Sequence, residues 1–337
     1  MNNLLRIGIS FLLICACNTL LPAQTLKVGP IGITVRDLDR SVSFYTEVLG
    51  FKKVGETEVF GESVEKEKNL FGIRMKIARL QLGDEFIELT DYLTSGGRSI
   101  PEDAKSNDLI FQHIAIVVND MDKAYQQLRQ HHVEQVSTGP QTLPLSNIAA
   151  AGIRAFYFRD PDGHNLELIY FPKGKGQAKW QIANLKIFLG IDHTAIGVSD
   201  TEKSLQFYRD LLGIERKGDS WNKGTEQEHL NYVKGASLHI TGMRAAGGPG
   251  VEFLQYLIPG AGKAYPADTK SDDLWYWETT IYVDDAQSLF NKLKSTGAHI
   301  LSEDIVSLTG TDHSLYLSFI VRDPDGHAIQ VMQPVKK

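Results

Sequence analysis

Apolar and polar positions repeat four times along the 337-residue chain. In each repeat an apolar strand ends in valine and is followed by an acidic turn and an amphipathic helix. The strands are at 32–35, 115–118, 195–198 and 280–283, so their final valines lie 83, 80 and 85 residues apart. Units of this length are small supersecondary modules rather than separate domains.

The first repeat shows the expected order of elements. Val42, Tyr45 and Leu49 recur at helical spacing, and Gly50 follows where a left-handed helix cap is favoured. Short β-rich runs come next, at 74–80 and 85–89. We therefore predict modules of β-α-β-β-β order.

Two pairs of similar repeats indicate a duplication. The second and fourth repeats share the pentapeptide Asp-Pro-Asp-Gly-His, at 160–164 and 323–327, whose Pro and Gly suit a tight turn between strands. The odd repeats likewise match each other. We predict a first domain over 29–172 with modules 29–92 and 109–172, a linker over 173–189, and a second domain over 190–335 with modules 190–258 and 274–335. The linker begins with an exposed Gly- and Lys-rich stretch.

Composition narrows the class of partner. The formal net charge of -6 is modest and no basic run stands out, so the chain does not look like a nucleic-acid-binding protein. Its apolar and charged fractions are those of an ordinary globular protein with a sizeable core. A small-molecule substrate is the expected partner.

The first residues predict export. Residues 1–23 combine Arg6 with an apolar run from 7 to 16 that is too short to span a bilayer, which is typical of a secretory signal peptide. Cleavage could follow Ala23, or precede Cys17 and leave a lipid anchor. We expect a periplasmic or secreted protein without a transmembrane span in the mature chain. Because Cys15 and Cys17 are the two cysteines, any metal must be held by His, carboxylate or amide groups.

Several motifs resemble one protein family. Segment 35–41 with Phe44-Tyr45 and Leu49-Gly50-Phe51, together with segment 160–168, is similar to the glyoxalase, bleomycin-resistance and ring-cleaving dioxygenase proteins, the vicinal oxygen chelate superfamily. The resemblance extends from about residue 29 to 333. It implies an α+β fold of four βαβββ modules, paired into two clefts that often hold a divalent metal.

The resemblance also implies where ligands would lie. One position is on the first strand of each module, here Pro30, His113, His193 and Glu278. The other is on the last strand, here Glu88, Glu167, Glu252 and Gln330.

Two ways of pairing the modules remain open. If sequential modules pair, each cleft lacks part of a His/Glu/His/Glu set. If the inner modules pair with each other and the outer modules do likewise, one cleft contains His113, Glu167, His193 and Glu252. Every position at which the His/Glu pattern is broken then lies in the other cleft. We favour the second arrangement because a duplicated protein can lose one site and keep the other.

The complete set suits one divalent ion. Two neutral imidazoles and two carboxylates neutralise its charge and leave coordination positions open, which fits Zn, Mn, Fe, Co or Ni. Glu167 interrupts an apolar run, and burying such carboxylates together is costly without a cation.

The expected activity is that of a metal-dependent lyase or isomerase acting on a small, oxygen-rich substrate. The ion would hold neighbouring substrate oxygens while a ligating carboxylate, Glu167 or Glu252, moves a proton. A ring-cleaving dioxygenase and a non-catalytic, ligand-sequestering protein are the alternatives. An exported protein would meet little reduced glutathione, which argues against glyoxalase I itself. Weaker candidates for substrate binding are Tyr157, His229 and Tyr232.

Overall fold

The computed structural model describes residues 25–183 and 185–336. The predicted signal peptide and the lipid-anchor candidate Cys17 lie outside the described residues. Within these ranges, no helix combines the length and apolar character that crossing a membrane requires.

The odd repeats contain one helix more than the β-α-β-β-β order predicts. The first comprises β1 Thr25–Val35, α1 Leu38–Ser43 with a π-helical turn at Phe44–Val48, β2 Lys52–Phe60, α2 Glu62–Lys68, β3 Arg74–Leu82 and β4 Glu85–Tyr92. The third comprises β9 Phe188–Gly197, α4 Thr201–Leu205 with a π-helical turn at Gln206–Leu211, β10 Glu215–Lys223, α5 Thr225–Asn231, β11 Ser237–Arg244 and β12 Gly250–Ile258. The additional helices are α2 and α5.

The even repeats have short strands in place of β2 and β10. The second comprises β5 Gln112–Val118, α3 Met121–Gln130, β6 Gln141–Thr142, β7 Arg154–Arg159 and β8 Asn165–Tyr170. The fourth comprises β13 Trp277–Val283, α6 Ala286–Ser295, β14 His299–Ile300, β15 Val306–Thr309, β16 Leu315–Arg322 and β17 Ala328–Pro334. A 3-10 turn at Ala178–Gln181 lies between the second and third repeats.

The acidic turn that follows each first strand is a helix cap. Side chains at the N-caps of α1, α3, α4 and α6 accept hydrogen bonds from backbone N–H groups of the first helical turn, and these residues are Asp37, Asp120, Asp200 and Asp285. At the other end of the first helix, Gly50 has φ of 71°, as its predicted cap position requires.

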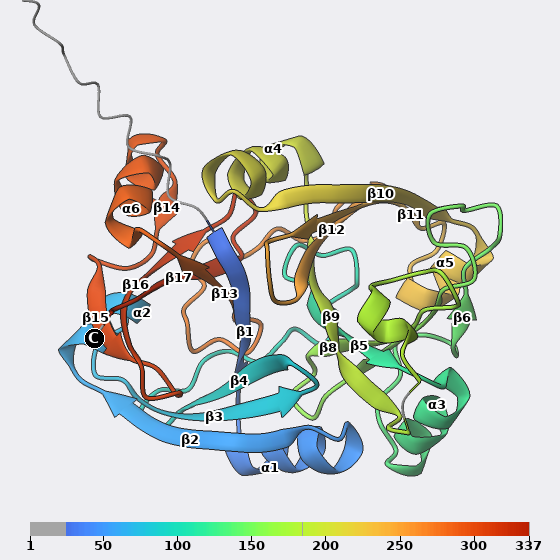
Figure 1. Ribbon diagram of the computed structural model, residues 1–337, viewed down its shortest axis with the longest axis horizontal. Coiled ribbons are helices and arrows are strands. Elements are labelled where there is room, and N and C mark those ends of the chain that lie inside the picture. Colours follow the sequence, from blue (N-terminus) through green and yellow to red (C-terminus); the bar gives the residue numbers. More distant parts are fainter. Residues whose placement is uncertain (1–24, 184, 337) are drawn as a thin grey trace, which may run out of the picture.

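The strands form two sheets. The inner sheet contains the second and third repeats in the order β10-β11-β12-β9-β5-β8-β7-β6. The outer sheet contains the first and fourth repeats in the order β14-β16-β17-β13-β1-β4-β3-β2, with β15 beside β16. Figure 1 shows the green and yellow strands of the inner sheet beside the blue and orange strands of the outer one.

Inner modules therefore pair with each other, and outer modules do likewise. The junctions are the antiparallel pairs β5–β9 and β1–β13. Each of the two continuous halves of the chain contributes one module to each sheet. The α+β class with paired modules is confirmed.

One apolar core connects the four repeats. Its largest cluster includes strand residues from all of them, among them Ile33, Ile116, Ile196 and Ile281, each at most 1% exposed. Burial of such side chains is the main favourable term in folding. The halves cannot be separated without exposing this core.

The shared pentapeptide ties neighbouring repeats together. The buried Asp160 carboxylate accepts hydrogen bonds from the Tyr45 hydroxyl at 3.2 Å and from His164 Nδ1 at 2.8 Å. In the second half Asp323 does the same for Tyr208 and His327. The motif thus has a structural role, since it joins a helical segment of an odd repeat to the last turn of the following even repeat.

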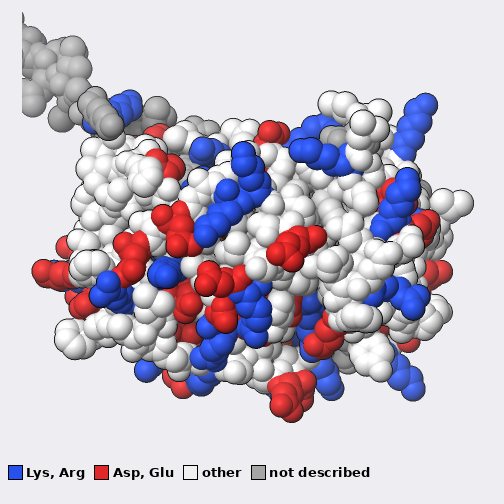
Figure 2. Space-filling view, turned by 90° about the horizontal axis from the view of Figure 1, so that it is seen from below, with Lys and Arg blue, Asp and Glu red and all other residues white. Residues whose placement is uncertain are grey.

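Charged side chains are mixed on the face shown in Figure 2. Blue Lys and Arg groups alternate there with red Asp and Glu groups, without a continuous basic stripe. This face therefore lacks the electrostatic pattern of a nucleic-acid-binding surface.

Candidate metal centre

Strand register brings four predicted ligand positions together on the inner sheet. Ala115 of β5 lies opposite His193 of β9 and also beside Glu167 of β8. Ala195 of β9 lies opposite His113 and beside Glu252 of β12. The two sets are related by the approximate two-fold symmetry of the β5–β9 junction.

The side chains of these residues meet at one point. His113 Nε2 lies 3.2 Å from Glu167 Oε2, and His193 Nε2 lies 3.7 Å from the same oxygen and 3.4 Å from Glu252 Oε2. One ligand atom from each of His113, Glu167 and His193 falls within 4.8 Å of the others. The structure thus brings these predicted residues together in one cleft.

The two imidazoles of the cluster are buried, and three of their four ring nitrogens lack a hydrogen-bond partner among the described residues. His113 is 1% exposed and His193 is 6% exposed. Within the described residues, neither ring nitrogen of His113 nor Nε2 of His193 makes a hydrogen bond. Buried polar atoms are nearly always satisfied. Because imidazole nitrogens and carboxylate oxygens suit a divalent transition metal or zinc, the arrangement fits such an ion.

Asp192 orients one of the two imidazoles. Its Oδ2 lies 3.0 Å from His193 Nδ1, and the same carboxylate accepts hydrogen bonds from Arg244 Nη2 at 2.6 Å and Trp180 Nε1 at 2.6 Å. With Nδ1 carrying the proton, His193 Nε2 presents its lone pair to the cluster. Such an outer carboxylate is a common support for a metal-binding histidine.

Asp192 was not predicted to lie at the site, because neighbouring strand residues normally point to opposite faces. The register of β9 against β5 shifts between His193 and Ile191, so that Asp192 forms a bulge. A bulge can turn a side chain toward the face of its neighbour. The signal in the sequence is only the pair Asp192-His193, which does not reveal the bulge.

The electrostatics of the cluster favour a positive charge at its centre. Burial lowers the pKa of His193, but the carboxylates of Glu252, Asp192 and Glu167 outweigh that effect and raise it to about 9. Burial raises the pKa of Glu252 despite the nearby imidazoles. A divalent cation would compensate the negative charge of the same carboxylates.

A cavity of about 330 Å³ opens beside the cluster, and its wall includes Glu167, His193, Glu252 and Tyr157. Tyr157 is 4% exposed, and its ring centroid lies 4.9 Å from that of His113. Burial raises the pKa of Tyr157, so its hydroxyl stays protonated and can donate. Of the other two weak candidates, His229 is exposed on α5 and Tyr232 is 74% exposed at its end. Neither belongs to the cavity wall.

The remaining four predicted positions meet on the outer sheet. Gly32 of β1 lies between Glu278 of β13 and Glu88 of β4, and Thr280 lies beside Gln330. Pro30 is buried at the fourth position. No imidazole is present at these positions, as the module pairing predicts.

Comparisons with known proteins agree with the fold. A lactoylglutathione lyase of Schizosaccharomyces pombe is 25% identical over 92% of this chain and 97% of its own length. A 2-epi-5-epi-valiolone epimerase of Actinomyces is 33% identical over 44% of this chain and 81% of its own. Glyoxalase I from Zea mays has a similar fold, with a TM-score of 0.60, 19% identity and 92% of both chains covered.

Two segments, residues 27–168 and 190–331, match one family profile. Together they include nearly all of the described chain. The matched segments contain the eight ligand-type positions of both sheets. The chain therefore belongs to the Glyoxalase/Bleomycin resistance protein/Dioxygenase superfamily.

Proposed function

We propose that the inner cleft binds one divalent metal ion and catalyses a lyase or isomerase reaction on a small, oxygen-rich substrate. The ligands would be His113, Glu167, His193 and Glu252. The observation that supports this most directly is the convergence of two buried imidazoles and a buried carboxylate within 4.8 Å. A metal ion bound there would supply a Lewis acid.

Three residues of the inner cleft suit different roles in this reaction: a ligand, a base and a hydrogen-bond donor. Glu167 is 5% exposed and contacts both imidazoles, so it suits a permanent ligand. The Glu252 side chain is 27% exposed at the cavity wall, and its Oε2 lies 3.4 Å from His193 Nε2. Glu252 is therefore the better placed of the two candidate bases, because a substrate proton in the cavity can reach it. Tyr157 can donate a hydrogen bond to a substrate oxygen.

Likeness to two enzymes supports the reaction class. One relative is a lactoylglutathione lyase and the other an epimerase, and both names describe reactions of small oxygenated molecules. A ring-cleaving dioxygenase with two His and one Glu in the last two modules does not fit, since Glu278 and Gln330 occupy the fourth module's positions. Sequestration without turnover is the other alternative.

Elemental analysis of the purified protein tests the metal site. We expect one divalent ion per chain, and complete loss in both His113→Ala and His193→Ala. His229→Ala is the matched control, because this exposed histidine is not part of the cavity wall and its loss should leave metal content unchanged. Retention of metal in either of the first two variants would contradict shared ligation.

Activity then separates the reaction classes. The protein should be assayed with thiol adducts of methylglyoxal, with epimerisable sugar-like ketones and acids, and with catechols. We expect turnover in one of the first two groups, lost after metal removal and restored by metal. Turnover of catechols with oxygen uptake would instead support a dioxygenase, and tight binding without turnover would support sequestration.

A further inference from the structure

The outer cleft repeats the four-position geometry of the inner one, but a lysine side chain contacts one of its ligand-type residues. Lys68 ends helix α2, its side chain is 8% exposed, and its Nζ lies 2.7 Å from both carboxylate oxygens of Glu278. Glu67 Oε2 lies 3.6 Å from the same Nζ. Glu278 occupies the position that is histidine in the inner modules. The Lys68 ammonium group thus occupies the carboxylate of Glu278, which would otherwise be free to bind a metal.

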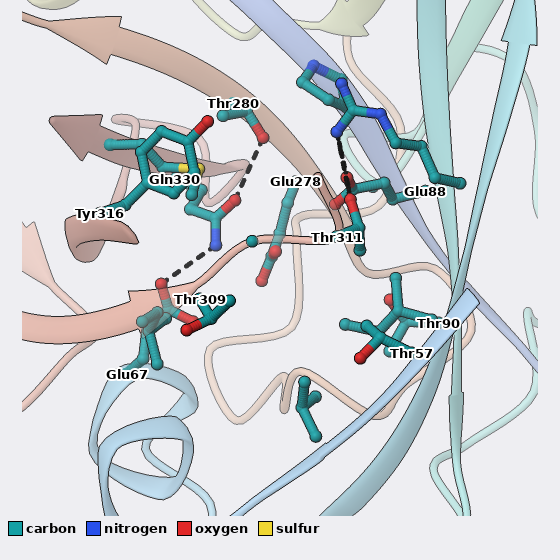
Figure 3. Close-up of a pocket in the computed structure, with 18 of the residues that line it drawn as sticks. Thr57, Glu67, Glu88, Thr90, Glu278, Thr280, Thr309, Thr311, Tyr316 and Gln330 are labelled. Atoms are coloured by element: carbon teal, nitrogen blue, oxygen red, sulfur yellow. Dashed lines mark hydrogen bonds and ion pairs between the residues drawn. The ribbon is translucent and has the colours of Figure 1, made fainter. Parts of the chain in front are cut away.

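The other two ligand-type side chains are engaged as well (Figure 3). Gln330 donates to Glu67 at 3.0 Å and accepts from Thr280 at 3.1 Å. Arg79 Nη1 lies 2.8 Å from Glu88 Oε1, which also accepts from Thr311. All three therefore already have partners from the protein itself.

Both cations of this cleft are engaged by carboxylates. Lys68 is held by Glu278 and Glu67, and the same carboxylates keep its pKa well above the ordinary value although burial opposes this. A fully protonated amine is a hydrogen-bond donor and not a nucleophile. Arg79 is matched by Glu88. An anionic ligand would meet no unpaired cation among these groups, and a metal ion would have to displace Lys68.

The cavity beside these pairs has a volume of about 80 Å³. This is roughly half of the 150 Å³ that accommodates benzene, so the space suits a compound of about three carbons. Its wall is rich in hydroxyl groups from Thr57, Thr90, Thr280, Thr309, Tyr282 and Tyr316. Hydroxyls both donate and accept, and Lys68 has three N–H groups, of which Glu278 can take two.

We propose that the outer cleft is a second, metal-independent binding site for a small neutral hydroxycarbonyl compound. The Lys68 ammonium donates to one ligand oxygen, and threonine hydroxyls bind the neighbouring oxygen. Both clefts would thus recognise adjacent oxygens, the inner one with a metal ion and the outer one with an ammonium group. The site does not depend on the function proposed for the inner cleft.

Titration with hydroxyacetone tests the proposal, with threonine methyl signals in NMR spectra as the readout. We expect saturable shifts for threonines of the outer cleft and none for Thr241, which lies in the inner sheet. Acetone, which lacks the hydroxyl, and lactate, which carries a charge, should bind at least about tenfold more weakly. The shifts should persist with EDTA and in His113→Ala.

Substitutions test whether Lys68 contributes to hydroxyacetone binding. Lys68→Met should weaken binding at least about tenfold, since a hydrogen bond from a charged donor is lost. Because this change leaves Glu278 buried without its partner, Lys68→Met/Glu278→Gln is a second, charge-balanced variant with the same expected loss. Thr90→Val keeps every ion pair and should also weaken binding.

Three results would overturn the proposal. They are the absence of saturable shifts in the outer-cleft threonines, a requirement for metal, and unchanged hydroxyacetone affinity in the charge-balanced variant. Metal content of the inner cleft is measured on the same samples. It distinguishes failure of this proposal from failure of the function proposed above.

Discussion

At the scale of single residues, the candidate centre depends on side chains that orient one another through hydrogen bonds. His193 is oriented by Asp192, which is in turn held by Arg244 and Trp180. The resemblance to the family implied the ligand positions, at equivalent places in the four repeats. Their support was not predictable, because Trp180 lies in the segment between repeats and Asp192 in a bulge.

Asp192→Asn should weaken metal binding by about 10- to 100-fold, the usual effect of removing an outer-shell carboxylate. The amide can no longer hold His193 with a full negative charge, so the imidazole loses its fixed tautomer. Competition with a coloured chelator measures the affinity. Asp219→Asn is the control, since Asp219 lines the same cavity and contacts His239. Equal losses in both variants would argue against a specific role for Asp192.

The buried pairs His164–Asp160 and His327–Asp323 predict a pH dependence of stability. Burial lowers the pKa of each histidine, but the partner aspartate outweighs this and raises it above the ordinary value. A raised folded-state pKa means that the stabilisation is complete below the unfolded value, about 6.5, and is lost as pH rises through the folded value.

Denaturant unfolding should therefore show a free energy of unfolding that falls as pH rises above about 6.5, by up to about 1.4 kcal/mol per pH unit for each group. In the metal-free protein His193 contributes to the slope as well, so His164→Gln should remove about one third of it and leave the parts due to His327 and His193. The slope, rather than absolute stability, is compared because the substitution also alters a buried contact. An unchanged slope would contradict the assignment.

At the scale of elements, hydrophobic periodicity and turn chemistry predicted most of what the structure shows. The four first strands, the aspartate-capped helices and the turns of the shared pentapeptide lie where expected. The helices α2 and α5 were not predicted, although α2 carries Lys68. Their apolar pattern is brief, and each has seven residues, so tertiary packing rather than intrinsic propensity must stabilise them.

Tyr45→Phe should destabilise the protein by about 1.5 to 3 kcal/mol, because the buried Asp160 carboxylate loses a donor. The change removes the link between the first helical segment and the last turn of the second repeat. Tyr208→Phe, at the duplicated position, should cost a similar amount. Thermal unfolding measures both. Metal content should stay unchanged, and its loss would show that the motif affects the site.

At the scale of the whole molecule, the metal site would join two repeats. His113 and Glu167 come from the second repeat, and His193 and Glu252 from the third, so a bound ion would cross the β5–β9 junction. A ligand that binds only the folded state stabilises it by mass action.

Added metal should therefore raise the unfolding temperature, with about 2.7 kcal/mol of stabilisation at a free concentration 100 times Kd. Differential scanning calorimetry with and without EDTA measures this effect. His113→Ala should show none of it. Lys68→Met/Glu278→Gln should keep all of it, because the outer cleft holds no ligand to that ion. A metal-dependent shift in His113→Ala would place the ion elsewhere.

The sequence alone determined the four repeats, their duplication as a pair and the equivalence of eight ligand-type positions, because periodicity and spacing are local properties of the chain. The tertiary structure decided which repeats share a sheet, because the apolar pattern of a first strand does not identify its partner strand and the long-range ladders β5–β9 and β1–β13 do. It also decided that Asp192 reaches His193 and Lys68 reaches Glu278. Such contacts depend on a bulge and on the packing of a short helix, which no pattern along the chain specifies.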